Sequence, residues 1–239
     1  MMCFEDEIIA YWNNRAAAFS QHTERRLGYP CSQHWQKLIL DHLPNQSKLD
    51  IIDMGCGAGF FSLLMAKAGH RVTGLDLSPE MLKKAQLLAE QNGISMTWKQ
   101  APADRTPFPD DYFDVVLSRN LSWTVPRLDQ LYLEWHRLLK PGGFLLNFDA
   151  DYGKVLFASP SKDPKDHDEL DRSTLKWCDA LKDKCQSNHL DRPLADLRFL
   201  KNMGFNTRCL PDISPFIPYD DQYTSHGLKM FLIIAQKAD

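Results

Sequence analysis

The sequence predicts an α/β fold with a doubly wound, mostly parallel sheet, and three observations support this prediction. An apolar run over residues 49–54 is followed by glycine at every second position, and then by apolar residues at helical spacing as far as Ala68. A second apolar run, residues 72–75, ends at Asp76. Further apolar runs, at residues 115–117 and 144–148, alternate with helical patterns, which is the order that βαβ units produce.

The glycine segment predicts an anion-binding turn between a strand and a helix. Gly55, Gly57 and Gly59 can adopt positive φ and, without Cβ atoms, let a ligand approach the backbone. The helix that follows directs free N–H groups and the positive end of its dipole at whatever lies in the turn. The spacing Asp53-x-Gly55-x-Gly57-x-Gly59 differs from the G-x-G-x-x-G of dinucleotide-binding proteins.

This spacing resembles motif I of the class I S-adenosylmethionine-dependent methyltransferases, small-molecule type. Four later segments resemble that family in the expected order: residues 71–76, 78–82, 113–118 and 138–143. The resemblance implies a Rossmann-like sheet of seven strands that closes with residues 205–210 and an antiparallel last strand at residues 229–235. It also implies S-adenosyl-L-methionine as the cofactor.

The resemblance also implies which residues bind the cofactor. Asp76 would hold the ribose hydroxyls, a role that serves NAD equally well, and Met81 would pack on adenine. Pro102 departs from the family pattern, because an acidic residue usually receives the adenine amino group there; Asp104 and the N–H of Ala103 are the substitutes. The expected set is Asp53, Gly55, Cys56, Gly57, Gly59, Asp76, Leu77, Met81, Ala103, Asp104, Ser118, Arg119, Asn120, Tyr11 and Arg15.

Residues 4–19 predict a helix, residues 20–34 a polar loop, and residues 35–43 a second helix that ends at Pro44. The first helix resembles the W-x-x-x-A-x-x-F/Y opening of many small-molecule methyltransferases. In that family the segment folds over the cofactor, with Tyr11, Arg15 and Phe19 as contacts. An amphipathic helix that packs its aromatic side chains on the core is the alternative interpretation.

Residues that follow the predicted fourth and fifth strands are expected at the ligand-binding edge of the sheet. Trp123, Asp149, Tyr152 and Tyr29 are therefore candidate substrate contacts, and Asp149, Tyr152 and His34 are candidate catalytic residues. Trp123 could instead lie in the core beside a helix cap. An aspartate at a strand end such as Asp149 is also an ordinary cap.

The chain is expected to form one domain of four parts. Residues 1–44 would be a helical lid, 45–152 the cofactor-binding core, 153–192 a helical cap inserted after the fifth strand, and 193–239 the last helix and closing strands. The insertion contains the acidic run Asp166-His167-Asp168-Glu169. Consecutive residues of a helix point in different directions, so a solvated face is favoured over a metal site.

Composition excludes several classes of function. The 239 residues carry a formal net charge of −3 and no dense Lys/Arg block, so no nucleic-acid partner is expected. No apolar run approaches the roughly 18 residues of a membrane span, and the first residues lack the pattern of a signal peptide. The six cysteines are scattered without a C-x-x-C pair, which predicts reduced thiols and a cytoplasmic location. Nothing in the sequence indicates an oligomeric state.

These observations predict a methyltransferase that acts on a small molecule. No N-P-P-Y/F motif is present, and no Pro-Cys nucleophile like that of the cytosine C5 methyltransferases follows the predicted fourth strand, so the common nucleic-acid and protein acceptors lack support. Which acceptor atom is methylated stays open. Two alternatives also stay open: a non-catalytic protein that binds S-adenosylmethionine, and an NAD(P)-linked oxidoreductase, which the glycine spacing and the antiparallel last strand disfavour.

Overall fold

The computed structural model describes residues 3–45, 48–159, 171–218 and 228–238, and its centre is one seven-stranded sheet. The strands lie in the order β3-β2-β1-β4-β5-β7-β6, and β7 runs antiparallel to both of its neighbours. Their bounds are β1 Asp50–Met54, β2 Arg71–Asp76, β3 Thr97–Gln100, β4 Phe113–Arg119, β5 Leu139–Ala150, β6 Asn206–Leu210 and β7 Met230–Gln236. The predicted fold class, including the antiparallel last strand, is confirmed.

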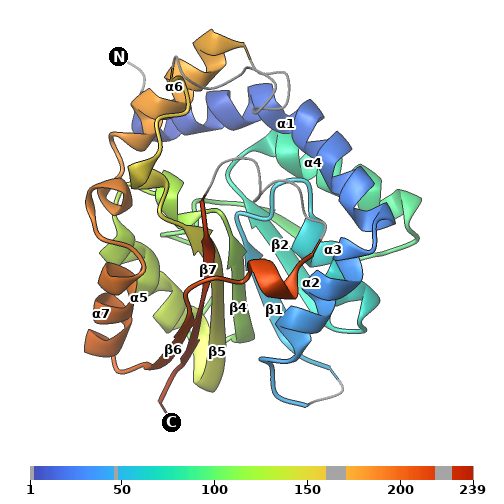
Figure 1. The fold of residues 1–239 in the computed structure, drawn as a ribbon. Helices are drawn as coiled ribbons and strands as arrows, with labels where there is room; N and C mark the ends of the chain where they lie inside the picture. The colour runs from blue at the N-terminus through green and yellow to red at the C-terminus, as the bar shows by residue number, and fades with distance from the viewer. Residues whose placement is uncertain (1–2, 46–47, 160–170, 219–227, 239) are drawn as a thin grey trace.

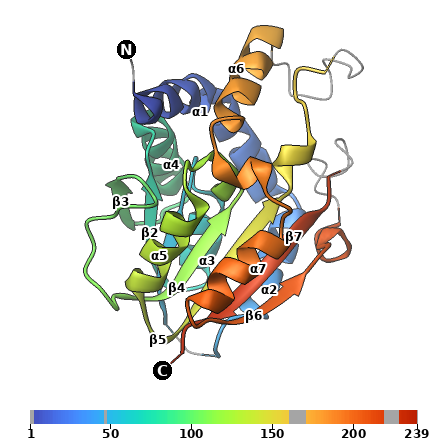
Figure 2. The ribbon, with the colours of Figure 1, turned by 90° about the vertical axis from the view of Figure 1, so that its left-hand side faces the viewer.

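Helices cover both faces of the sheet and one of its edges (Figure 1). α2, α3 and α4 lie on one face, and α5 and α7 on the other, as the second view shows (Figure 2). α1 and α6 lie across the edge at which the parallel strands end. The helices are α1 Phe4–Gly28, α2 Cys31–Leu40, α3 Phe60–Lys67, α4 Pro79–Gln91, α5 Leu128–Leu138, α6 Arg172–Lys182 and α7 Leu194–Asn202.

The central strands are apolar at consecutive positions because both faces of the sheet are covered. Ile51 packs with Trp35 of α2 and Phe61 of α3 on one face. Ile52, the next residue, packs with the α5 side chains on the other face. Successive side chains of a strand point to opposite faces, so a sheet buried on both sides requires a continuous apolar run.

The first helix is longer than predicted, and the predicted loop over residues 20–34 is wrong. α1 continues to Gly28, and only Tyr29 and Pro30 separate it from α2. Polar residues in this stretch suggested a loop, but Thr23 is buried and Leu27 packs against the core. The stretch is therefore an amphipathic helix that ends at its first glycine.

The segment after β5 crosses back over the edge of the sheet. It contains the short helix η2 (Tyr152–Lys154), then α6, then η4 (Gln186–His189). The acidic run 166–169 lies outside the described residues. Among the residues that the structure describes, no group of three or more His, Cys, Asp or Glu side chains could hold a metal ion, and no helix is long and apolar enough to cross a membrane.

Candidate cofactor and substrate site

A cavity of about 590 Å³ lies between the C-terminal edge of the sheet and the two helices that cross it. Its floor is the loops that follow β1, β2, β3 and β4. Its roof consists of α1, residues 152–158 and α6, and we call residues 152–158 and α6 the cap. The cavity is within the size range of small-molecule and cofactor sites.

The glycine loop, residues 55–59, forms one wall with its backbone. Gly55, Gly57 and Gly59 have φ of +64°, +53° and +89°. A Cβ on Gly55 would lie 2.7 Å from Cδ1 of Leu121, whereas a Cβ on Gly57 would meet no atom within 4 Å. Gly55 and Gly57 line the cavity, while Gly59 begins α3 outside it. A ligand can thus approach the loop at Gly57, where a side chain would take its place.

Asp76, at the end of β2, is held by the glycine loop. Its carboxylate accepts the N–H of Gly57 at 2.8 Å and the N–H of Ser78 at 2.8 Å. Ser78 in turn caps α4 by accepting the N–H of Met81. Burial raises the pKa of Asp76 to about 6, and the two backbone N–H groups oppose that rise.

Asp53, at the end of β1, is a fully buried carboxylate below the loop, whereas Asp76 is half-buried. Asp53 accepts the hydroxyl of Ser62 in α3 at 2.6 Å. Burial raises its pKa to about 7, the Ser62 hydrogen bond opposes this, and the guanidinium of Arg119 opposes it further. The floor therefore holds two carboxylates that gain from hydroxyl or cationic groups of a ligand.

The inward face of α1 forms the roof opposite these carboxylates. Tyr11, Arg15 and Phe19 all line the cavity, as expected for a lid. Arg15 is only 7% exposed, and its Nε and Nη1 have no hydrogen-bond partner among the described residues. Asn13 fixes the helix in place, because its Oδ1 accepts the hydroxyl of Ser78 at 2.7 Å.

A sequence profile of methyltransferase domains matches residues 52–147. This stretch contains the glycine loop, Asp76 and the loops after β3 and β4. Residues 52–147 are a methyltransferase domain. The resemblance to class I S-adenosylmethionine-dependent methyltransferases is thereby confirmed for the floor of the cavity, with S-adenosylmethionine as the cofactor of that family.

Relatives support the same assignment over part of the chain. An uncharacterised protein of Mycobacterium tuberculosis is 36% identical over 110 residues, which are 44% of this chain and 40% of that protein. A demethylmenaquinone methyltransferase of Tropheryma whipplei is 31% identical over 133 residues, 56% of this chain and 55% of the enzyme. The chain thus spans about half, or less, of the curated relatives that it matches.

Solved structures show the same fold over most of the chain. A protein of Methanococcus maripaludis described as an S-adenosylmethionine-dependent methyltransferase has a TM-score of 0.65 at 17% identity, over 95% of this chain and 94% of that one. Phosphoethanolamine N-methyltransferase 2 of Haemonchus contortus, solved with S-adenosylmethionine, has a TM-score of 0.64 at 20% identity, over 86% of this chain and 52% of that one.

The structure brings most of the expected cofactor residues to one cavity. The lining includes Asp53, Gly55, Cys56, Gly57, Asp76, Leu77, Met81, Ala103, Asp104, Arg119, Asn120, Tyr11 and Arg15. Gly59 and Ser118 are the exceptions. Gly59 precedes α3 outside the cavity lining, and Ser118 is buried within the sheet, where it donates its hydroxyl to the carbonyl of Met54 at 3.3 Å. Pro102 also lines the cavity, beside Ala103 and Asp104.

Of the expected substrate and catalytic residues, Trp123, Tyr152 and Tyr29 line the cavity, but His34 and Asp149 do not. His34 lies on α2, where its Nδ1 is 3.1 Å from the carbonyl of Pro30. Asp149 has no exposed surface and is part of a buried ion network. The structure contradicts both predictions, since neither side chain reaches the cavity.

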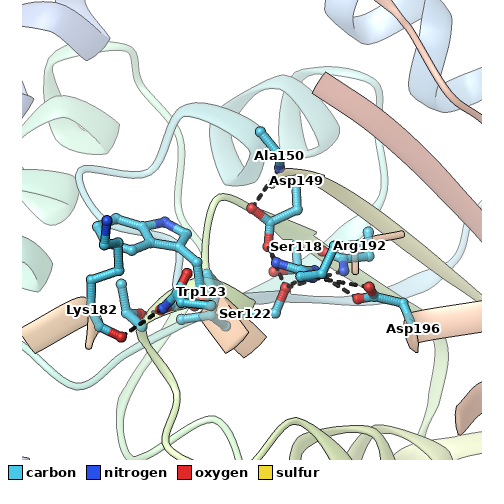
Figure 3. A network of polar contacts seen from close by, with 12 residues as sticks. Ser118, Ser122, Trp123, Asp149, Ala150, Lys182, Arg192 and Asp196 are labelled. Atoms are coloured by element: carbon cyan, nitrogen blue, oxygen red, sulfur yellow. Dashed lines mark hydrogen bonds and ion pairs between the residues drawn. The ribbon is translucent and has the colours of Figure 1, made fainter. Parts of the chain in front are cut away.

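A buried network of polar contacts explains why Asp149 does not reach the cavity (Figure 3). Asp149 accepts the hydroxyl of Ser122 and lies 3.2 Å from Nη1 of Arg192. Nη2 of Arg192 also donates to Ser122 at 2.8 Å and to Asp196 at 2.6 Å. Arg192 has no exposed side-chain surface either, and two carboxylates raise its pKa well above the usual value. The carboxylate at the end of β5 is thus a structural ion-pair partner.

Sequence reasoning missed the part of the lining that belongs to the second half of α1 and to the cap. These residues are His22, Thr23, Arg25, Arg26, Phe157, Leu175 and Cys178. A signal for α1 was present: Arg15, Phe19, His22 and Arg26 have the i, i+4, i+7, i+11 spacing of one helix face. Ending the predicted helix at residue 19 hid it.

Proposed function

We propose that this chain is an S-adenosylmethionine-dependent methyltransferase that acts on a small molecule. One observation carries the proposal: a single cavity joins the glycine loop and Asp76 to an aromatic cap, with Trp123 and Tyr152 in its wall. Cofactor and acceptor need such a shared, enclosed space, because transfer requires both reactants at near-attack distance with water excluded.

The residues of the cavity fit the cofactor of the family. Asp76 can accept the two hydroxyls of a ribose, and the open space at Gly57 admits the cofactor beside the loop. Arg15 offers two buried N–H groups that have no partner in the part of the chain that the structure describes, and these suit a carboxylate. Leu77, Met81 and Ala103 supply the apolar surface for adenine. We infer that these are the cofactor-binding residues, with Asp104 and Arg119 beside them.

The cofactor, when bound, supplies a methyl group on a sulfonium, which a nucleophile takes by in-line displacement. The chain's own residues then have to orient the acceptor and keep water out. With Asp149 in the buried network, Tyr152 is the candidate that stays in the cavity. A base is needed only where the acceptor arrives protonated.

We further propose the division into a lid (1–44), a cofactor-binding core (45–152), a cap insertion (153–192) and a closing segment (193–239). The contacts of α1 and α6 with the cavity support the first and third parts. All six cysteines are free thiols, which supports the expected cytoplasmic location. No nucleic-acid partner is proposed, given the net charge of −3.

Turnover separates this proposal from a non-catalytic binding protein. Purified protein is incubated with S-adenosylmethionine and a panel of small-molecule acceptors, and the release of S-adenosylhomocysteine is measured. We expect release that depends on at least one acceptor and is lost in Asp76→Ala. Tight cofactor binding without release for any acceptor class would contradict the enzyme and support the non-catalytic alternative.

A further inference from the structure

Trp123 joins the aromatic rings of α1 to those of the cap. Its indole ring lies 6.2 Å from Trp12 on α1, and 4.8 Å from Tyr152 and 5.9 Å from Phe157 in the cap, measured between ring centroids. Trp12 in turn contacts Phe19, with centroids 5.3 Å apart. All five rings line the cavity, and we call them the aromatic wall. Such a wall suits a flat, apolar body, because aromatic rings pack favourably on the faces and edges of other rings.

The backbone of Trp123 is held in place from two sides. The residue belongs to the short helix η1 (Ser122–Thr124). On one side, the hydroxyl of Ser122 accepts Nη2 of Arg192 at 2.8 Å. On the other side, the carbonyl of Trp123 accepts Nδ2 of Asn188, from η4, at 2.7 Å. The buried network therefore also fixes the backbone from which the indole ring projects (Figure 3).

The indole N–H of Trp123 is a buried donor without an acceptor. The residue is 6% exposed, and no group in the described parts of the chain accepts its Nε1–H. A donor that is buried without a partner destabilises the folded state, so native structures seldom keep one without a reason. Because Trp123 lines the cavity, a ligand can supply the missing acceptor.

A small void lies beside this ring, between α1 and α6. Its volume is about 10 Å³, and Tyr11, Trp12 and Trp123 line both the void and the main cavity. The space is about that of one water molecule, or of one oxygen atom on a ligand. A body that lies on the aromatic wall can thus project one small polar group toward the indole.

We propose that the methyl acceptor is a flat aromatic compound with a carbonyl, ether or hydroxyl oxygen, and that this oxygen accepts the indole N–H of Trp123 while the aromatic wall holds the ring body. The inference rests on the proposed function, since it assigns the acceptor part of the same cavity. Trp123 is then a specificity-determining residue, because it favours an acceptor with this oxygen over one of the same shape without it.

Packing of the cap on α1 gives a second reason for aromatic residues here. Tyr11 and Trp177 also join α1 to α6, with ring centroids 5.3 Å apart. That role requires the rings alone. It does not require the N–H of Trp123, which phenylalanine lacks. A comparison of ligands that differ in a single oxygen atom separates the two roles.

The test uses two probes of nearly the same shape, with the full chain in saturating S-adenosylhomocysteine. 2-Acetylnaphthalene carries a carbonyl oxygen, and 2-isopropenylnaphthalene has a methylene group in its place. Equilibrium dialysis gives the dissociation constant of each probe. The variant is Trp123→Phe. The matched control is Trp12→Phe, which trims the same aromatic wall and keeps the indole N–H of Trp123.

The decisive quantity is the ratio of the two dissociation constants, because water solvates the ketone better than the hydrocarbon in every experiment. From wild type to Trp123→Phe the ratio should shift against the ketone by about fivefold, the worth of roughly one neutral hydrogen bond. In Trp12→Phe both probes should weaken alike, with the ratio within about twofold of wild type. An unchanged ratio in Trp123→Phe, or the same shift in both variants, would overturn the proposal.

Nuclear magnetic resonance of the wild type gives a second readout that needs no variant to fold. The chain has six tryptophans, so six indole N–H signals are expected. One of them should move downfield with the ketone but not with the hydrocarbon, and this signal should persist in Trp12→Phe. A spectrum in which no indole signal responds to the ketone alone would contradict the proposal.

Both probes should bind together with S-adenosylhomocysteine. Competition between the ketone and S-adenosylhomocysteine would place the probe in the cofactor part of the cavity and overturn the assignment. If S-adenosylhomocysteine itself does not bind, the proposed function fails, and the probe comparison is run without it to test Trp123 by itself.

Discussion

The glycine loop and the cap enclose one cavity but are built in different ways. The loop is local: residues 55–59 turn at positive φ, and its hydrogen bond to Asp76 spans 19 residues. The cap is held by residues distant in sequence, with Lys184 paired to Glu7 across 177 residues and the rings of Tyr11 and Trp177 5.3 Å apart. Backbone geometry shapes the floor, and side-chain packing shapes the roof.

The two regions also bury charge differently. The floor keeps Asp53 buried and Asp76 half-buried. The pKa values of both are raised, and neither has a Lys or Arg ion pair among the described residues, so both can gain from a ligand. Outside the cavity, Arg192 is buried between Asp149 and Asp196. The two carboxylates of the floor are available to bind a ligand. The charges of the Arg192 network neutralise one another, so that network stabilises the fold. Substitutions can test this difference.

The largest expected effect is on stability and comes from the ion network. Arg192→Met should lower the free energy of unfolding by about 3–5 kcal/mol, because Asp149 and Asp196 would stay buried without their cation. Urea unfolding measures it, with the exposed Arg198→Met on α7 as the control. A loss below about 1 kcal/mol would show that the network does not support the structure as described.

Gly57→Val should abolish cofactor binding, with a loss of affinity of about a hundredfold or more, because a branched side chain would occupy the space beside the loop. Gly69→Val is the matched control. Gly69 also has positive φ, +95°, and an open Cβ position, but it lies outside the cavity lining. Both variants should lose similar stability, so equal binding by the two would refute the role of the loop.

Asp76→Ala should weaken the binding of S-adenosylmethionine by about 1.5–3 kcal/mol, the scale of hydrogen bonds to a charged group. Glu90→Ala, on the exposed side of α4, is the control. Unchanged affinity in titration calorimetry would remove the ribose role from Asp76.

The pH dependence of binding should follow Asp76. Its pKa is raised to about 6, so the carboxylate that accepts ribose hydroxyls is ionised above pH 6 and protonated below it. Wild-type affinity should therefore fall as the pH drops from 8 to 5, whereas the affinity of Asp76→Ala should change less. Parallel pH profiles for the two proteins would contradict this assignment.

The smallest effect on cofactor affinity is expected from the hydrogen bond that joins α1 to the start of α4. Asn13→Ala removes the acceptor for the hydroxyl of Ser78 and should weaken cofactor binding by about 1 kcal/mol, with a similar loss of stability. Asn14→Ala changes the neighbouring exposed residue and should be neutral. If both variants bind equally, closure of α1 over the cavity does not depend on this contact.

The sequence predicted the locally built floor of the cavity better than the parts that depend on contacts between distant residues. The strand–glycine–helix unit and Asp76 were predictable because their geometry depends on neighbouring residues. The role of Asp149 was not, because its partner Arg192 is 43 residues away and the pair forms only in the folded chain. The second half of α1 was hidden because His22 and Arg26 resemble loop residues until the tertiary contacts of Leu27 show that the helix continues.

The central claim is that the cavity binds S-adenosylmethionine through the glycine loop and Asp76. Calorimetric titration of the purified protein with S-adenosylmethionine, S-adenosylhomocysteine and NAD tests it most directly. We expect micromolar binding of the first two and none of NAD. Binding of NAD alone would contradict the methyltransferase assignment, and binding of none of the three would contradict the cofactor site, with Pro102 as the first residue to restore to an acidic side chain.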